Sequence, residues 1–193
     1  MCDFHSPSRL RYSILLPMSA NWFLALPVST KPWYPEQIPN PPANIRLIRR
    51  ENIHLTVAFL GDVGEENALK GWHKHPLFQL PPIDIQLDRM QSFGNPKRPA
   101  LAATLKTGKE SVEQAIAQSR DEMLAAARCL PEKRPPHAHI TLARPKRKST
   151  PAQLKEALRW AEHMDLSTVR IRLNEIALYT WSEDKSGFVY KLV

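Results

Sequence analysis

The chain has 193 residues, enough for one compact domain with a buried core and too few for two large domains. Its 27 lysines and arginines exceed its 19 aspartates and glutamates, and the net charge of +8 favours either an anionic partner, such as nucleic acid or a phosphorylated small molecule, or a generally basic surface. The two cysteines form neither a metal-binding spacing nor a disulfide framework, and no apolar run approaches the roughly 20 residues that span a bilayer, so we expect a cytoplasmic protein with no membrane segment.

The N-terminal quarter combines one strand with a proline-rich segment. We expect residues 1–20 to form a poorly ordered extension, because the first predicted element follows them. The apolar run 21–28 ends in proline, which predicts a buried strand. Residues 27–43 are dense in proline, which excludes a regular helix there. Within them, Trp33 and Tyr34 are expected to cap the core, with stacking on a base as the alternative.

The rest of the chain alternates between strand and helix patterns. Apolar alternation predicts strands over 45–49, 53–60, 83–88, 100–106, 169–173 continuing towards Trp181, and 188–193 after a turn at 184–187. Apolar spacing of three and four predicts helices over 65–75, 110–128 and 150–163. Thr150 as N-cap with Pro151 and Gln153 forms a capping box for the third helix. Because neither βαβ alternation nor a glycine-rich phosphate loop is present, the fold class is predicted to be α+β with antiparallel sheets.

Two segments of the chain share one spacing of histidine and threonine. They are His54-Leu55-Thr56-Val57 and His139-Ile140-Thr141-Leu142, and their histidines lie 85 residues apart. Side chains two residues apart on a strand point to the same face, so each segment presents an imidazole beside a hydroxyl. An imidazole titrates near neutrality and a hydroxyl can donate to an anionic oxygen, which suits phosphate chemistry.

The paired motifs, together with Phe59-Leu60-Gly61, Arg144, the opening strand and the turn at 94–99, resemble the two-histidine (2H) phosphoesterase superfamily. The nearest branch is the RNA 2′,3′-cyclic phosphodiesterases, also called 2′-5′ RNA ligases or LigT-like proteins. The resemblance implies a single domain over 21–193, a bilobal, pseudo-symmetric α+β fold with two antiparallel sheets facing a central cleft and helices outside. Relatives usually carry a helix where this chain has its proline-rich segment, which leaves the covering of that lobe open.

The resemblance also implies an activity: hydrolysis of the 2′,3′-cyclic phosphate of RNA, including tRNA, or of a nucleotide to a 2′-phosphate. It needs no metal and no other cofactor, because one imidazole acts as general acid and the other as general base. We assign His54 as the acid and His139 as the base, with the reverse order left open. Thr56 and Thr141 would hydrogen-bond the non-bridging oxygens. The expected partner is the RNA or nucleotide itself, and the expected state is a monomer without an obligate protein partner.

Arg144 and Phe59 each follow a motif histidine by five residues and match positions that lie beside the terminal nucleoside in relatives. An odd offset on a regular strand points away from the histidine, so both roles require the strand to twist or end first. Phe59 could equally belong to the core. His137 shares a face with His139, so it could support that histidine or, less simply, pair with it on a metal.

Two other functions remain open at this level. The same chemistry could act on another cyclic or 2′-5′ linked nucleotide. Alternatively, the chain could be a non-catalytic RNA-binding module, whose binding would be strongly salt-dependent and would survive loss of either histidine. Three runs of basic residues, which end at Arg50, Arg134 and Lys148, either steer RNA phosphates or form solvated surface.

Overall fold

The computed structural model describes residues 21–181 and 188–192. The expected N-terminal extension and the turn at 184–187 lie outside these residues. The strands are β1 Trp22–Pro27, β2 Ile45–Leu47, β3 His54–Gly61, β4 Ile83–Phe93, β5 Ala100–Thr107, β6 His139–Pro145, β7 Arg170–Leu173, β8 Ala177–Trp181 and β9 Phe188–Leu192. The helices are α1 Gly64–Trp72, α2 Lys109–Ala126 and α3 Pro151–Glu162, with short 3₁₀ turns η1 Arg50–Asn52 and η2 His75–Leu77.

The strands form one curled sheet in which every pair is antiparallel, with the order β7-β4-β5-β6-β3-β1-β8-β9 and with β2 added to β6. It consists of two halves, β3-β1-β8-β9 and β7-β4-β5-β6-β2, which meet where Leu55 of β3 pairs with Ile140 of β6. The first and last described strands both belong to the first half. The prediction of an α+β fold with antiparallel strands is therefore confirmed, and the two expected sheets are the two halves of one continuous sheet.

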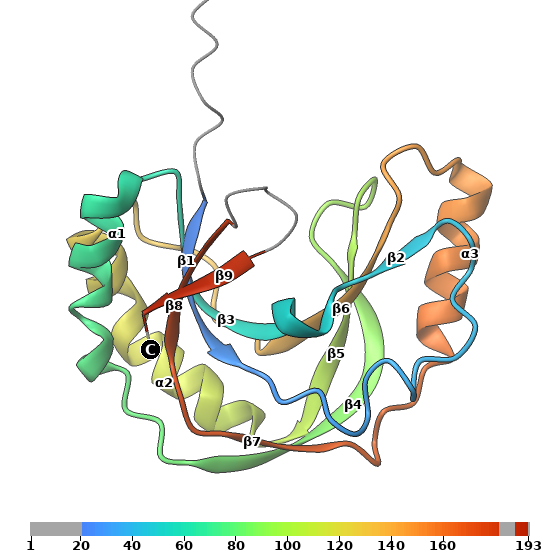
Figure 1. Cartoon of the computed structure of the whole chain (residues 1–193), viewed down its shortest axis with the longest axis horizontal. Helices are drawn as coiled ribbons and strands as arrows, with labels where there is room; N and C mark the ends of the chain where they lie inside the picture. The colour runs from blue at the N-terminus through green and yellow to red at the C-terminus, as the bar shows by residue number, and fades with distance from the viewer. Residues whose placement is uncertain (1–20, 182–187, 193) are drawn as a thin grey trace, which may run out of the picture.

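The helices lie outside the sheet, on both flanks (Figure 1). Helices α1 and α2 pack against each other and cover β1 and β3 of the first half, whereas α3 packs on β4 of the second half. Buried apolar residues from both halves form one large core cluster, which includes Leu55 and Ile140, the pair at which the halves meet. No helix within the described residues is long and apolar enough to cross a membrane.

The proline-rich segment has no regular helix, as predicted, and contributes two aromatic residues to the core. Trp33 and Tyr34 retain only 3% and 1% of their exposed surface. The Trp33 indole N–H donates to the Ser29 carbonyl at 2.8 Å. The Tyr34 hydroxyl donates to the Ile48 carbonyl and lies 3.2 Å from the Leu142 carbonyl. The capping role is confirmed, and their burial leaves neither ring a face for a base.

Local sequence signals place most element boundaries within two or three residues. The capping box at Thr150 and Gln153 is present, with Gln153 N donating to Thr150 Oγ1 at 3.3 Å and Thr150 N donating to Gln153 Oε1 at 2.9 Å. At the start of α2, Gly108 has a φ of 77°, and an added Cβ would lie 2.7 Å from Ile85 Cγ2, so only glycine fits there.

The prediction of a single strand from residue 169 towards Trp181 is wrong. Strand β7 ends at Leu173 and pairs with β4 at the edge of the second half, whereas β8 begins at Ala177 and pairs with β1 in the first half. One continuous strand cannot pair with both partners, so residues 174–176 cross between the halves. Strand β4 is longer than expected, because a shift in register between Leu87 and Met90 lets it bend without ending.

Candidate functional site

The two motif strands are neighbours at the centre of the sheet. Leu55 pairs with Ile140, and both side chains are fully buried on one face. In this antiparallel register His54 lies across from Thr141, and Thr56 lies across from His139. The four polar side chains therefore share the opposite face, and each histidine is set beside the threonine of the other motif. The arrangement has an approximate two-fold symmetry.

Each motif strand contains a β-bulge directly after its threonine. Val57 is an extra residue between two successive pairs of β3 with β1, and Leu142 is an extra residue between two successive pairs of β6 with β5. A bulge shifts the alternation of side chains by one position. Residues that follow the histidine by five positions, Phe59 and Arg144, consequently return to the face of the histidine.

Because of the two bulges, the side chain five positions after each motif histidine points to the site and not away from it. Both Phe59 and Arg144 are exposed, and Phe59 keeps 60% of its accessible surface. The alternative that Phe59 belongs to the core is therefore wrong. The structure brings all six candidate residues to one face of two adjacent strands: His54, Thr56, Phe59, His139, Thr141 and Arg144.

The first histidine is held by a backbone bond and an aromatic wall. His54 Nδ1 lies 2.7 Å from the Asn52 carbonyl oxygen. Its ring centre lies 4.7 Å from that of Phe23 and 5.4 Å from that of Tyr179, and these two rings stack on each other. Both aromatic side chains are buried. The imidazole thus has a fixed orientation on an apolar support.

The second histidine has a matching environment. His139 Nδ1 lies 2.7 Å from the His137 carbonyl oxygen, and its ring stacks on Phe93 with centres 4.6 Å apart. The segment before β6 is anchored to α2, because the Ala138 N–H donates to Glu113 Oε1 at 2.9 Å. His137 is exposed, and its Nδ1 lies 3.9 Å from the same carboxylate oxygen. His137 therefore supports His139 through its backbone.

The two backbone bonds define the proton state of both rings. A carbonyl oxygen can only accept, so Nδ1 of each histidine carries the proton. In the neutral imidazole, Nε2 is then the basic nitrogen, and in the imidazolium, Nε2–H is the acid. Either ring is equipped to take or give a proton at the same atom.

Burial and neighbouring positive charges disfavour the charged imidazoles. Burial is the main cause that lowers the pKa of His54 to about 4, and the charges of His139 and Arg144 lower it further, against the effect of the backbone bond. Burial likewise lowers the pKa of His139, with His137 and Arg144 as additional causes. Burial and the nearby Arg46 lower the pKa of Arg144. In the free protein both histidines are neutral at pH 7, and an anion between them would favour their protonation.

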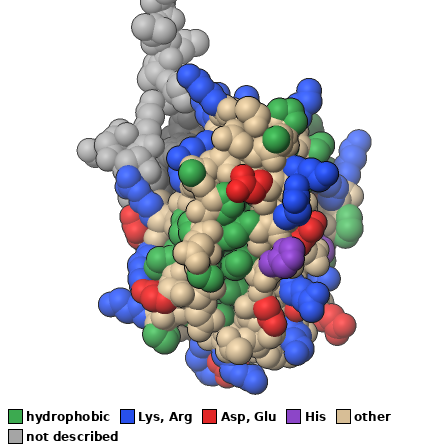
Figure 2. All heavy atoms as spheres, turned by 90° about the vertical axis from the view of Figure 1, so that its right-hand side faces the viewer, with side chains coloured by type: hydrophobic (Ala, Val, Ile, Leu, Met, Phe, Trp, Pro, Cys, Tyr) green, Lys and Arg blue, Asp and Glu red, His purple; other side chains and the backbone are tan. Residues whose placement is uncertain are grey.

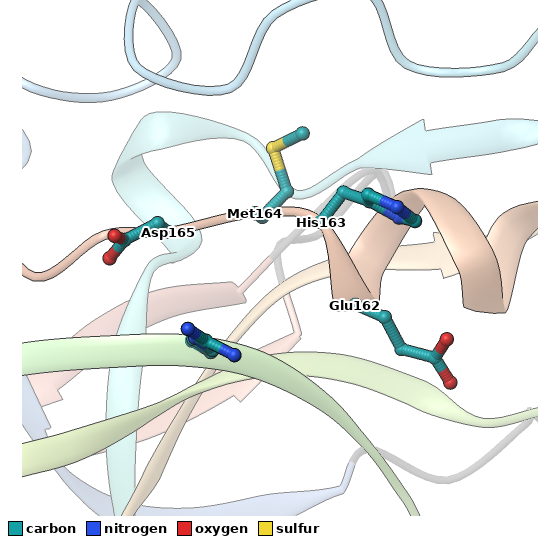
Figure 3. Close-up of a pocket in the computed structure, with 5 residues that line it drawn as sticks. Glu162, His163, Met164 and Asp165 are labelled. Carbon is teal, nitrogen blue, oxygen red and sulfur yellow. The ribbon is translucent and has the colours of Figure 1, made fainter.

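Two hollows lie outside this constellation. One of about 230 Å³ is lined by Arg89 and residues 162–165, where α3 ends beside β4. Its labelled side chains point in different directions and do not converge on one ligand (Figure 3). The other, of about 420 Å³, is lined by residues 28–31, Arg50, Glu51 and Ile53, next to the first motif. Among the residues that the structure describes, no three histidine, cysteine, aspartate or glutamate side chains gather as a metal site.

The sequence-based expectation that His137 could support His139 agrees with the bond to its carbonyl, but the other residues that orient the imidazoles were missed. Asn52 stands two residues before His54, as His137 does before His139, so the spacing alone could have identified its carbonyl. Phe23, Tyr179 and Phe93 come from β1, β8 and β4, and only the strand order places them beside the site.

Known proteins are similar to this chain in sequence and in fold. Residues 38–185 match the family model of the 2′-5′ RNA ligase superfamily. A protein of Aeropyrum pernix described as an RNA 2′,3′-cyclic phosphodiesterase is 26% identical over 147 residues, which cover 76% of this chain and 82% of that protein. Escherichia coli LigT complexed with 3′-AMP is similar in structure with a TM-score of 0.64 and 21% identity, over 90% of this chain and 94% of LigT. The protein TT0787 of Thermus thermophilus has a TM-score of 0.55 and 20% identity, over 90% of this chain and 94% of that one. The chain belongs to the 2′-5′ RNA ligase superfamily.

Proposed function

We propose that this protein is a metal-independent phosphodiesterase that opens the 2′,3′-cyclic phosphate at the end of an RNA or nucleotide and leaves a 2′-phosphate. The observation that carries the proposal is the pair of His–Thr motifs on one face of adjacent strands, with matching bonds from Nδ1 to the backbone. The name of the Aeropyrum pernix relative supports the same substrate class.

The reaction requires one proton to be removed and one to be donated. Nε2 of His139 takes a proton from water as its oxygen attacks phosphorus, and Nε2–H of His54 protonates the 3′ oxygen as the bond from phosphorus to that oxygen breaks. The enzyme ends with His139 protonated and His54 neutral, and exchange of protons with solvent restores the starting state. The charge of the phosphate supplies the field that keeps His54 protonated, because an anion raises the pKa of a neighbouring imidazole.

The other candidate residues bind the substrate. The hydroxyls of Thr56 and Thr141 donate to the two non-bridging oxygens, on which negative charge increases in the transition state. Arg144 adds a positive charge on the same side, and the exposed ring of Phe59 offers a face on which the terminal base can stack.

The test is turnover in excess EDTA of an RNA oligonucleotide that ends in a 2′,3′-cyclic phosphate. We expect a 2′-phosphate product from the unaltered protein and a loss of at least about a thousandfold in kcat for His54→Ala and for His139→Ala. His73→Ala is the matched control, because His73 is exposed on the surface beyond α1. Turnover that requires a metal would refute the proposal. Absence of turnover by the unaltered protein, together with strongly salt-dependent RNA binding that survives loss of either histidine, would refute it as well.

The same assay assigns the two histidines. A cyclic substrate with sulfur in place of the 3′ oxygen has a leaving group that needs no proton. It should restore turnover to the variant that lacks the acid and not to the variant that lacks the base. We expect rescue of His54→Ala, and rescue of His139→Ala alone would reverse the assignment. A panel that includes 3′,5′-cyclic and 2′-5′ linked nucleotides measures the preference for the 2′,3′-cyclic end.

A further inference from the structure

The short strand β2 adds a second arginine to the site. Arg46 of β2 pairs directly with Arg144 of β6, and both side chains are exposed. Residues directly opposite in an antiparallel pair share a face, with Cβ atoms about 4.5–5.5 Å apart. Because the bulge at Leu142 returns Arg144 to the face of the motif histidine, Arg46 also extends from that face. Two like charges in this position repel each other.

No carboxylate of the described residues compensates this pair. Neither guanidinium forms an ion pair within 4.0 Å in that part of the chain, whereas Arg50, Arg134 and Arg172 each contact an acidic side chain. The sequence explains the difference, because residues 37–50 and 133–155 contain no aspartate or glutamate. Elsewhere the signs are mixed: on the face that carries α3, lysine and arginine are interspersed with acidic side chains (Figure 2).

The charges follow one another away from the two imidazoles. Arg144 is close enough to both His54 and His139 to lower their pKa, and Arg46 in turn lowers the pKa of Arg144. Directly after β6, the exposed residues 146–148 continue the positive charge. Arg46 therefore occupies the next position outward from the reacting centre. It lies on β2, which pairs with the end of β6, beyond the residue at which β6 pairs with β3.

We propose that Arg46 binds the phosphodiester on the 5′ side of the terminal nucleotide, so that the protein acts on RNA chain ends in preference to mononucleotides. The inference rests on the proposed function. A nucleoside 2′,3′-cyclic phosphate has a single phosphate, and in the proposed function the two His–Thr pairs and Arg144 bind it. An RNA chain brings a further phosphate beyond the terminal ribose, and a planar guanidinium can bind two of its oxygens at once.

The test compares two substrates, a short RNA oligonucleotide with a 2′,3′-cyclic end and cytidine 2′,3′-cyclic phosphate. For Arg46→Gln we expect the ratio of their kcat/KM values, oligonucleotide over mononucleotide, to fall about tenfold. For a single strand, each phosphate contact contributes about 0.7 to the slope with which the logarithm of the binding constant falls against the logarithm of the salt concentration. For Arg46→Gln and the oligonucleotide, this slope should therefore fall by about 0.7. Arg46→Lys should retain the slope and lose part of the ratio.

Arg170→Gln is the matched control, because Arg170 is an exposed arginine on edge strand β7 and the variant should keep the ratio and the slope of the unaltered protein. Binding of the product oligonucleotide, which ends in a 2′-phosphate, gives a readout that does not depend on turnover, and Arg46→Gln should weaken it about tenfold. An unchanged ratio and unchanged binding for Arg46→Gln would overturn the inference. Absence of turnover with both substrates, despite binding that depends on Arg46, would instead overturn the proposed function.

Discussion

At the scale of residues, each motif histidine is kept neutral in the free protein and ready to act. The bonds from Nδ1 to the carbonyls of Asn52 and His137 leave Nε2 as the functional atom, and burial lowers the pKa of both rings. A general acid must nevertheless be protonated, so the charge of the substrate is part of the mechanism. This makes the pH dependence of the free protein differ from that of the complex.

We therefore predict that the optimum of kcat/KM lies below pH 6.5. This quantity reports the free protein, in which one imidazole must be charged and the other neutral, and both pKa values lie below 6.5, that of His54 at about 4. The optimum of kcat should lie at a higher pH, because the bound phosphate raises both values. Initial rates from pH 4 to 9 provide the measurement.

Arg144→Gln checks the cause of this pH dependence. The substitution removes a positive charge that lowers the pKa of both histidines. The profile of kcat/KM against pH should therefore move to higher pH, whether or not its maximal value also changes. Arg170→Gln should not move the profile. An optimum of kcat/KM above pH 7 for the unaltered protein would contradict the account of the two pKa values.

At the scale of elements, the site depends on two bulges and on the segment that supports one of them. The bulge at Leu142 turns Arg144 towards the motif face, and the Leu142 carbonyl accepts the Ile48 N–H at 2.9 Å. The Tyr34 hydroxyl lies against the carbonyls of both residues. Burial raises the pKa of Tyr34 to about 12, so it remains a donor at all working pH values. The proline-rich segment thus stabilises the junction of β2 and β6.

We predict that Tyr34→Phe lowers the free energy of unfolding by about 1–2 kcal/mol, because a buried hydrogen bond to the backbone is lost. It should also lower kcat/KM several-fold by loosening the strand that carries Arg144. Asn67→Ala is the control, since it removes the hydrogen bond from Asn67 Nδ2 to the Val63 carbonyl at the start of α1, on the flank of the other half (Figure 1), at a cost of about 1 kcal/mol. Urea unfolding and initial rates measure both quantities, and equal kcat/KM values for the two variants would contradict the role of Tyr34.

At the scale of the whole molecule, two similar halves meet at one residue pair and contribute one motif each. The sequence was sufficient to predict the class of fold, the shared face of each His–Thr pair and the capping box at Thr150, because these follow from local periodicity and spacing. The bulges, the crossing from β7 to β8 and the pairing of Arg46 with Arg144 depend on which distant strands become neighbours. Local patterns contain no information about such pairing, and for the same reason the aromatic supports of the histidines were missed.

The central claim is that both motifs hold a single phosphorus between them. A crystal of the protein grown or soaked with inorganic phosphate tests it most directly. We predict one phosphate ion within hydrogen-bond distance of Oγ1 of both Thr56 and Thr141, with Nε2 of both His54 and His139 facing it. Two separate ions, one for each motif, or an ion bound elsewhere while this face holds only water, would contradict the claim.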